Sequence, residues 1–281
     1  VEMFNRGIRP DLILFADTAA EKPETYAYLP IMQAWLRSVG FPEITVVRFA
    51  PTHATYRTLE DKCLTNETMP SLAYGQHSCA LVFKVEVQVK YLRKHAAVRE
   101  LLAAGGRVVK CIGYDDSEAD RRRRAKADRA VAKKRLVIAD KINCGQKPGA
   151  NLWESQNCDY RYLLQDWNLE RTQLAEIIVA AGLPVPCKSA CFFCPASQPE
   201  EVVQLRLDHP ELYARAVAIE SLEHTGKHAV KRLAAGETIK HGLGMGNWAW
   251  SALATCSDPS QARATLRAAG FKVSKKAVLR P

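Results

Sequence analysis

The sequence predicts an α/β fold in which a Rossmann-like parallel sheet is covered by helices and followed by a cysteine-bearing, mostly helical C-terminal part. Residues 11–16, DLILFA, form a short continuous apolar run that is typical of a strand buried on both faces. Strand and helix patterns then alternate along the chain, which predicts parallel βα units. We expect an α/β domain over residues 1–186 and a cysteine-containing helical region over residues 187–281.

The individual elements follow from periodicity and from the signals at their ends. Residues 25–39 repeat apolar side chains at helical spacing, and residues 43–49 alternate as a second strand. Residues 84–104 indicate a helix that ends at two glycines, and residues 107–114 indicate a third strand. Further along we expect a basic helix, a loop-rich stretch, a short amphipathic helix and two more helices, at residues 117–135, 143–157, 171–181, 200–207 and 211–222.

The composition is that of a soluble globular protein. Of the 281 residues, 47% are hydrophobic and 25% charged, and no apolar run approaches the roughly 20 residues that cross a bilayer. We therefore expect no membrane span and no secretory signal. The chain has nine cysteines, an odd number, two of them in a CxxC pair, which favours a reducing compartment and so the cytoplasm.

The positive charge of the chain is unevenly distributed. The net charge is +10, and residues 121–135 contain nine Lys or Arg and a single Asp. A run of this kind fits a polyanionic partner, and Arg121, Arg122, Arg123 and Arg124 are the candidate nucleic-acid contacts. The alternative is a solvated helix face with no partner.

The first loop with reactive groups follows the first predicted strand. In an open α/β sheet, ligands bind beyond the carboxyl ends of the strands. Asp17 and Thr18 stand at such an end, and Glu21 and Lys22 follow before the next helix starts. These four residues are candidates for binding a ligand. An acidic residue near a helix start, such as Glu24, has the alternative role of a favourable charge near the helix dipole.

A second loop of this kind follows the third predicted strand. Gly113 lets the backbone approach a ligand closely, and Tyr114 and Asp115 come directly after it. The arginines from Arg121 onward suit phosphate oxygens. Phosphate chemistry is therefore expected at this loop.

Cys191 and Cys194 form a CxxC pair that is followed by Pro195. The pair could hold a metal, exchange electrons as a dithiol, or only pack. A thioredoxin-like pair starts a helix, and Pro195 indicates a loop instead. Thiolates suit iron–sulfur clusters and zinc alike, and most buried cysteines bind nothing, so these alternatives stay open.

Five segments, taken together and in order, are similar to the phosphoadenosine phosphosulfate (PAPS) reductase family. This family belongs to the ATP-pyrophosphatase-like, adenine nucleotide alpha hydrolase group. The similarity spans most of the chain, although any one segment would be a weak signal. The segments are FADTAAEKPETY (15–26), SCALVFK (78–84), IGYD and the residues up to Arg121 (112–121), YLLQDW (162–167) and CFFCP (191–195).

The resemblance implies a metal centre. Some members of the family and related sulfur-inserting proteins hold a [4Fe-4S] cluster, and Cys79, Cys191 and Cys194 match their cysteines. Where the reductases have two adjacent cysteines, Ala80 follows Cys79 here. The resemblance then leaves Cys63 or Cys187 as the fourth ligand, with a slight preference for Cys63; zinc is the alternative metal.

Two family features have no match. The tail with the reductases' catalytic cysteine is absent, since Cys256 lies in ATCSDPS. No SGGxDS-like phosphate loop, which would cradle pyrophosphate, occurs in these residues. The chain opens at Val1 inside a helix that follows this loop in the family, so we expect the first strand and the phosphate loop upstream.

The resemblance implies an ATP-pyrophosphatase-like enzyme that adenylates an acceptor, such as DNA or RNA, for sulfur transfer. It would bind ATP or a related adenine nucleotide with Mg²⁺, receive sulfur from a donor protein, and use the iron–sulfur cluster. Lys84 and Arg121 would be catalytic, stabilising charge on phosphate. One alternative is a non-catalytic, nucleic-acid-associated accessory protein, as an oligomer or in a larger complex. The second alternative is a sulfonucleotide reductase.

The glycine-rich stretch at residues 242–246 and the two tryptophans after it have structural interpretations. No strand precedes GLGMG, so it is predicted to be a loop and not a dinucleotide-binding turn. Trp248 and Trp250 are predicted to lie in a core or an interface.

Overall fold

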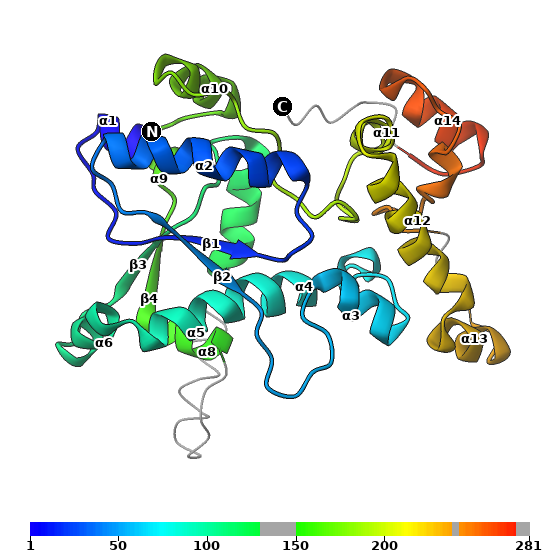
Figure 1. Ribbon diagram of the computed structural model, residues 1–281, viewed down its shortest axis with the longest axis horizontal. Coiled ribbons are helices and arrows are strands. Elements are labelled where there is room, and N and C mark those ends of the chain that lie inside the picture. Colours follow the sequence, from blue (N-terminus) through cyan, green and yellow to red (C-terminus); the bar gives the residue numbers. More distant parts are fainter. Residues whose placement is uncertain (130–149, 238–241, 274–281) are drawn as a thin grey trace.

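The computed structural model describes residues 1–129, 150–237 and 242–273, and for residues 150–152 the backbone only. It is a mixed α/β structure with two parallel sheets of two strands each. Figure 1 shows the strands and the helices around them at one end of the molecule and helices α11 to α14 at the other. The parallel α/β character predicted from the sequence is confirmed. The single continuous sheet is not seen, because the two pairs are separate sheets within the described residues.

The first sheet pairs β1 (Ile13–Asp17) with β2 (Ile44–Arg48), in a register that places Asp17 opposite Arg48. Helix α2 (Pro23–Ser38) connects the two strands and begins with a proline in its first turn, where a missing N–H costs nothing. A short helix, α1 (Glu2–Asn5), precedes β1. The strand–helix–strand order predicted for this part is confirmed.

One expectation for β1 is wrong. Its first three residues are only half-buried, and only Ala16 and Asp17 are buried. On β2, Val46 is 44% exposed, and on β3 Val109 is 60% exposed. The strands are less covered than the apolar run suggested, because β1 pairs with one strand only among the described residues.

A helical region follows β2. Helix α3 begins after Thr58, whose side chain forms a capping box with Asp61. The predicted helix 84–104 is two helices, because the backbone of His95 is extended, with φ −68° and ψ 125°. The first of them starts at Ser78 and contains a π-helical segment. The elements are α3 (Leu59–Asn66), η1 (Ser71–Tyr74), α4 (Ser78–Ala80), the π segment η2 (Leu81–Val85), α5 (Glu86–Lys94) and α6 (Ala96–Ala103).

The second sheet pairs β3 (Val108–Cys111) with β4 (Cys158–Arg161). Residues 118–129 are helical, as predicted, and the rest of the basic run at 130–135 lies outside the described residues. The loop predicted for residues 143–157 is wrong in its second half, where α8 (Ala150–Asn157) forms, and β4 was not predicted. Helices α9 (Leu163–Asp166) and α10 (Arg171–Ala180) follow.

The C-terminal part is helical, as expected, and the two helices predicted near residues 200 and 211 are confirmed. Trp248 and Trp250 are buried, also as predicted. The elements are α11 (Pro199–Asp208), α12 (Pro210–Thr225), α13 (Lys227–Ala234), η3 (Ser251–Leu253), η4 (Pro259–Gln261) and α14 (Ala262–Ala268). No helix within the described residues is long and apolar enough to cross a membrane.

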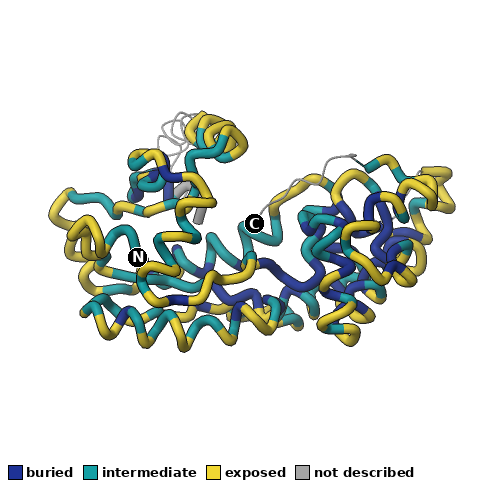
Figure 2. Tube along the Cα trace, turned by 90° about the horizontal axis from the view of Figure 1, so that it is seen from above, coloured by how far each residue is buried: buried dark blue, intermediate teal, exposed yellow. Residues whose placement is uncertain are grey.

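The main hydrophobic core joins the C-terminal helices to earlier parts of the chain. Leu59 and Phe83 pack in the same buried cluster as Phe193, Ile219 and Trp250. Figure 2 shows this buried material as dark blue segments that continue from the C-terminal helices into the middle of the molecule. The core therefore crosses residue 186, and the division into two domains at that point stays a prediction.

Candidate functional site

Asp17 organises the loop at the carboxyl end of β1. Its Oδ1 accepts hydrogen bonds from the Ala19 N–H (2.8 Å) and the Tyr26 hydroxyl (2.7 Å), and its Oδ2 accepts one from Arg48 Nε (2.8 Å). The backbone of Ala19 is left-handed, with φ 57°, so the turn is tight. With three donors on a buried carboxylate, Asp17 holds this loop in place. It would bind a ligand directly only by giving up one of them.

These contacts keep Asp17 ionised. Burial by itself would raise the pKa of Asp17, but the hydrogen bonds from Tyr26 and Arg48 outweigh burial and lower the pKa below its ordinary value. A lowered pKa in the folded state stabilises the fold above the unfolded pKa of about 3.9 and loses this effect as the pH falls through the folded value.

We expect Asp17→Asn to lower the free energy of unfolding at pH 7. The effect should shrink as the pH falls below about 3.9, because the unfolded carboxylate is protonated there, and it should be lost once the pH passes the lowered folded pKa of Asp17. Urea unfolding between pH 3 and pH 7 measures both. The exposed Asp11, mutated to Asn, is the matched control. An Asp17→Asn effect of the same size at pH 3 and pH 7 would contradict the assigned role of the carboxylate charge.

Glu21 is the centre of a buried polar network beside Asp17, and its side chain is 0% exposed. Its Oε1 accepts hydrogen bonds from Lys84 Nζ (3.1 Å) and the Thr18 hydroxyl (3.3 Å), and its Oε2 accepts one from the Ser189 hydroxyl (3.4 Å). The Thr18 oxygen also lies 3.2 Å from Cys191 Sγ. The network therefore connects residues from three distant parts of the chain, and a lysine compensates the buried charge of Glu21.

The backbone joins the same two loops. Glu21 and Cys191 form an antiparallel bridge, and the Phe192 N–H donates to the Ala20 carbonyl (2.9 Å). The predicted ligand loop after β1 and the cysteine loop are thus paired directly. Residue spacing could not predict this contact, because Thr18 and Cys191 are 173 positions apart.

The four preferred metal ligands lie around one core. Cys63 and Cys191 are buried in the main hydrophobic cluster, and Cys79 and Cys194 pack against it. Cys63 and Cys79 also line one cavity, and the Cys194 N–H donates to the Cys191 carbonyl (3.0 Å). The fold therefore brings the members of each of these two pairs together.

Cys187 is in a different environment. It is exposed, and the groups that influence its pKa after burial are Glu24, Lys22 and Thr25 near the start of α2. The candidate for the fourth ligand that lies with Cys79 is therefore Cys63. This placement agrees with the preference derived from the resemblance.

Burial keeps the thiols of Cys63, Cys191 and Cys194 protonated in the absence of a metal. It raises the pKa of Cys63 and of Cys191 to about 12, and it also raises the pKa of Cys194. Such thiols are poor nucleophiles, and a bound metal would replace their protons. Four soft donors around one core fit an iron–sulfur cluster or zinc in chemistry. No three His, Cys, Asp or Glu side chains of the described residues lie close enough together to form a metal-binding group, so the metal centre stays a prediction.

Two lysines lie beside the cysteines. Burial by itself would lower the pKa of Lys84, but the negative charge of Glu21 and its hydrogen bond to Lys84 outweigh burial and raise the pKa. The π segment η2 carries Lys84, and segments of this kind are frequent at functional sites. Lys188, which the sequence did not single out, pairs with Glu201 (2.9 Å), and its charge offsets only part of the burial that raises the pKa of Cys194. Both lysines would offset the charge of thiolates. Lys22, the other predicted lysine, comes directly before α2 as its N-cap.

The second predicted loop belongs to the other sheet. Asp115 forms a turn in which its Oδ1 accepts from the Ser117 N–H (3.0 Å), and the Tyr114 ring lies 5.7 Å from the Tyr162 ring. A Cβ added to Gly113 would meet no atom within 4 Å. Packing within the described residues therefore does not require a glycine there, and close approach of a ligand stays a prediction.

The four candidate arginines, Arg121 to Arg124, all have partners. Arg121 forms two hydrogen bonds with Asp116, at 2.7 and 2.6 Å, and Arg124 lies over the Tyr162 ring at 4.5 Å. Arg122 pairs with Glu118 and Arg123 with Asp120. A phosphate would have to compete with these carboxylates, and both the nucleic-acid contact and the solvated helix face stay predictions for this stretch.

Comparison with known proteins found no match of this chain to any family model, curated protein or solved structure.

Proposed function

We propose that the protein is an ATP-pyrophosphatase-like enzyme that adenylates an acceptor for sulfur transfer and holds a metal centre in its cysteines. One observation carries the proposal: the loop at the end of β1 and the cysteine loop are paired through Glu21 and Cys191. A nucleotide held at the strand end would therefore lie next to the thiols. The proposal includes the finer fold, in which both strand pairs belong to one Rossmann-like sheet, and a cytoplasmic location.

The proposed reaction has two steps. A nucleophilic atom of the acceptor attacks the α-phosphorus of Mg²⁺-bound ATP, which forms an acceptor–AMP bond and releases pyrophosphate. A sulfur nucleophile then displaces AMP from the acceptor. Lys84 would stabilise the negative charge on phosphate, and Glu21 would hold the lysine in position.

Cys63, Cys79, Cys191 and Cys194 would hold the metal centre, for which an iron–sulfur cluster is proposed. Such a centre supplies a thiolate-bound metal surface with affinity for sulfur. The net charge of +10 supports a nucleic acid as the acceptor. This part of the proposal does not depend on Arg121 to Arg124, which are engaged in ion pairs.

Mg²⁺-ATP is expected to bind the anaerobically purified protein saturably, and Lys84→Met is expected to weaken this binding about tenfold, the size of one lost charged hydrogen bond. Isothermal titration calorimetry measures both affinities. Lys84→Arg keeps the charge and should retain most of the affinity, and Lys94→Met on the exposed end of α5 is the matched control. A protein without saturable ATP binding would instead be the non-catalytic accessory protein.

A further inference from the structure

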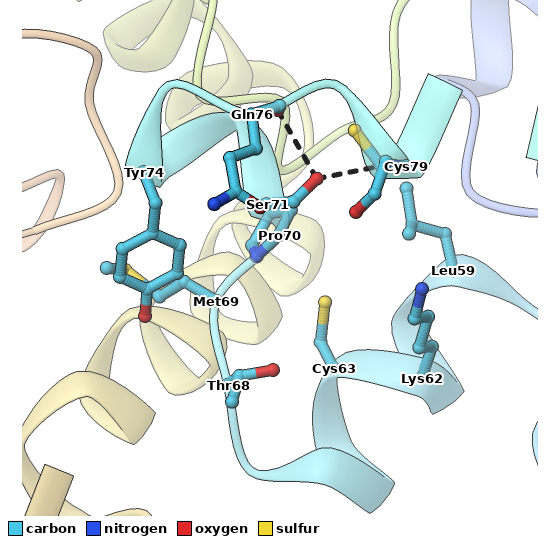
Figure 3. A pocket seen from close by; sticks show the side chains of 11 residues that line it. Leu59, Lys62, Cys63, Thr68, Met69, Pro70, Ser71, Tyr74, Gln76 and Cys79 are labelled. Atoms are coloured by element: carbon cyan, nitrogen blue, oxygen red, sulfur yellow. Dashed lines mark hydrogen bonds between the residues drawn. The ribbon is translucent and has the colours of Figure 1, made fainter. Parts of the chain in front are cut away.

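A small cavity lies on the side of the cysteines away from the β1 loop. Its volume is about 230 Å³, and it is lined by α3, by residues 68–71, by η1 and by the start of α4. Figure 3 shows the Cys63 thiol pointing into it from α3, with Cys79 and Ser71 on the opposite wall. None of the lining residues comes from the β1 loop or the cysteine loop at 189–194.

The size of the cavity limits its occupant. Cofactors and drug-sized ligands occupy about 300–1,000 Å³, and a water molecule has a share of about 30 Å³ in the liquid. A cavity of about 230 Å³ therefore admits a ligand of a few heavy atoms and excludes ATP. Any nucleotide must bind elsewhere.

The lining favours an anion. Lys62 is the single cationic side chain in it, and it contains no carboxylate. The Lys62 ammonium lies 5.9 Å from the Tyr56 ring and 5.8 Å from the Phe83 ring, and no carboxylate lines the cavity beside it. Aromatic rings attract the cation without using its hydrogen-bond donors, so Lys62 can still donate to an anion.

The lining also favours sulfur. The Cys63 thiol points into a space whose remaining wall includes Cys79 and is partly apolar, with Leu59, Met69 and Pro70. Polarisable sulfur packs well against thiols and apolar side chains, whereas an oxygen in the same position would lose hydrogen bonds to water. The Ser71 hydroxyl is engaged, because it accepts from the Cys79 N–H (3.1 Å) and donates to the Gln76 carbonyl (3.3 Å).

We propose that this cavity binds a small sulfur-bearing anion, of the class of thiosulfate, hydrosulfide or the terminal sulfur of a persulfide. The inference rests on the proposed function and deepens it, since it names the class of sulfur compound that the enzyme accepts. The anion approaches the cysteines from the Cys63 and Cys79 side, and the nucleotide from the Cys191 side. The two substrates therefore do not compete for one opening.

Equilibrium dialysis of the full chain, purified anaerobically, with ³⁵S-labelled thiosulfate tests this inference. Thiosulfate is expected to bind at about one per chain, and sulfate, which differs only by oxygen in place of the terminal sulfur, is expected to compete poorly. Lys62→Gln should weaken binding about tenfold, the size of one charged hydrogen bond. Lys90→Gln is the matched control. Lys90 also lies over an aromatic ring, that of Phe49, but it does not line the cavity.

Three results would overturn the inference: no saturable thiosulfate binding, equal competition by sulfate, or equal binding by Lys62→Gln and wild type. Circular dichroism of Lys62→Gln checks that the variant is folded, and Lys62→Arg, which keeps the charge, should retain binding if the cation is what matters. The experiment needs no ATP. If thiosulfate does not bind, the ATP-binding experiment still tests the proposed function. If ATP does not bind, the thiosulfate experiment still tests the cavity.

Discussion

The wild-type protein, purified anaerobically, is expected to carry about four iron and four sulfide ions per chain, as for a [4Fe-4S] cluster, and Cys191→Ala is expected to lose them. Cys79→Ala and Cys194→Ala are expected to behave alike. The reason is geometric: these thiols are held around one core by segments distant in the chain, and removal of one leaves an incomplete ligand set. Iron, sulfide and zinc analysis of each variant measures the effect.

The fourth ligand can be tested in the same series. Cys63→Ala should lose iron, whereas Cys187→Ala should keep it, because Cys187 is exposed near the start of α2. Cys111→Ala, on the exposed surface of β3, is the control for a cysteine outside the site. If the wild type contains zinc and no iron, and the cysteine variants lose the zinc, the predicted iron–sulfur cluster is wrong but the predicted cysteine ligands are right. A wild type without metal, or variants that keep all of it, would contradict the site itself.

Glu220→Gln is expected to destabilise the protein by about 3 kcal/mol. Glu220 is buried on α12, and its Oε2 accepts from the Leu243 N–H (2.8 Å) and the Trp250 N–H (2.7 Å). Its Oε1 accepts from the N–H (3.0 Å) and hydroxyl (2.7 Å) of Ser251. Glutamine would turn an amide N–H₂ toward two of these donors and would remove the charge that strengthens all four bonds.

The loss of stability also involves the loop at residues 242–251, whose backbone N–H groups donate to Glu220. A Cβ on Gly242 would lie 2.3 Å from Ala249 Cα, so the chain there is too closely packed to find a new arrangement. The midpoint of urea unfolding measures the loss, with Glu211→Gln on the exposed start of the same helix as control. A Glu220→Gln variant within about 0.5 kcal/mol of wild type would show that the loop holds without the carboxylate.

Local patterns predicted much of the secondary structure. The strand–helix–strand order around α2 and the helices α11 and α12 could be derived from periodicity and from proline and glycine positions, because these signals act over a few residues. The strand β4 was missed because it is only four residues long and does not alternate clearly. The break at His95 was missed because no glycine or proline marks it.

Glu220 shows the limit of such reasoning for polar residues. Its place in the sequence is an ordinary position of a predicted helix, with nothing to distinguish it from the exposed Glu211. Only the return of residues 242–251 to α12 makes it a buried acceptor. The charge run Arg121 to Arg124 shows the opposite case, where apparent free charge is taken up by acidic neighbours three to five positions away.

By itself, the sequence determined the parallel α/β character, the candidate loop after the first strand and the cysteines suited to a metal, since residue type and short-range spacing specify all three. The tertiary structure decided that Cys63 and Cys79 line one cavity and that Glu21 pairs with Cys191. Contacts between segments more than a hundred residues apart depend on how the whole chain packs. No pattern within a single segment encodes them.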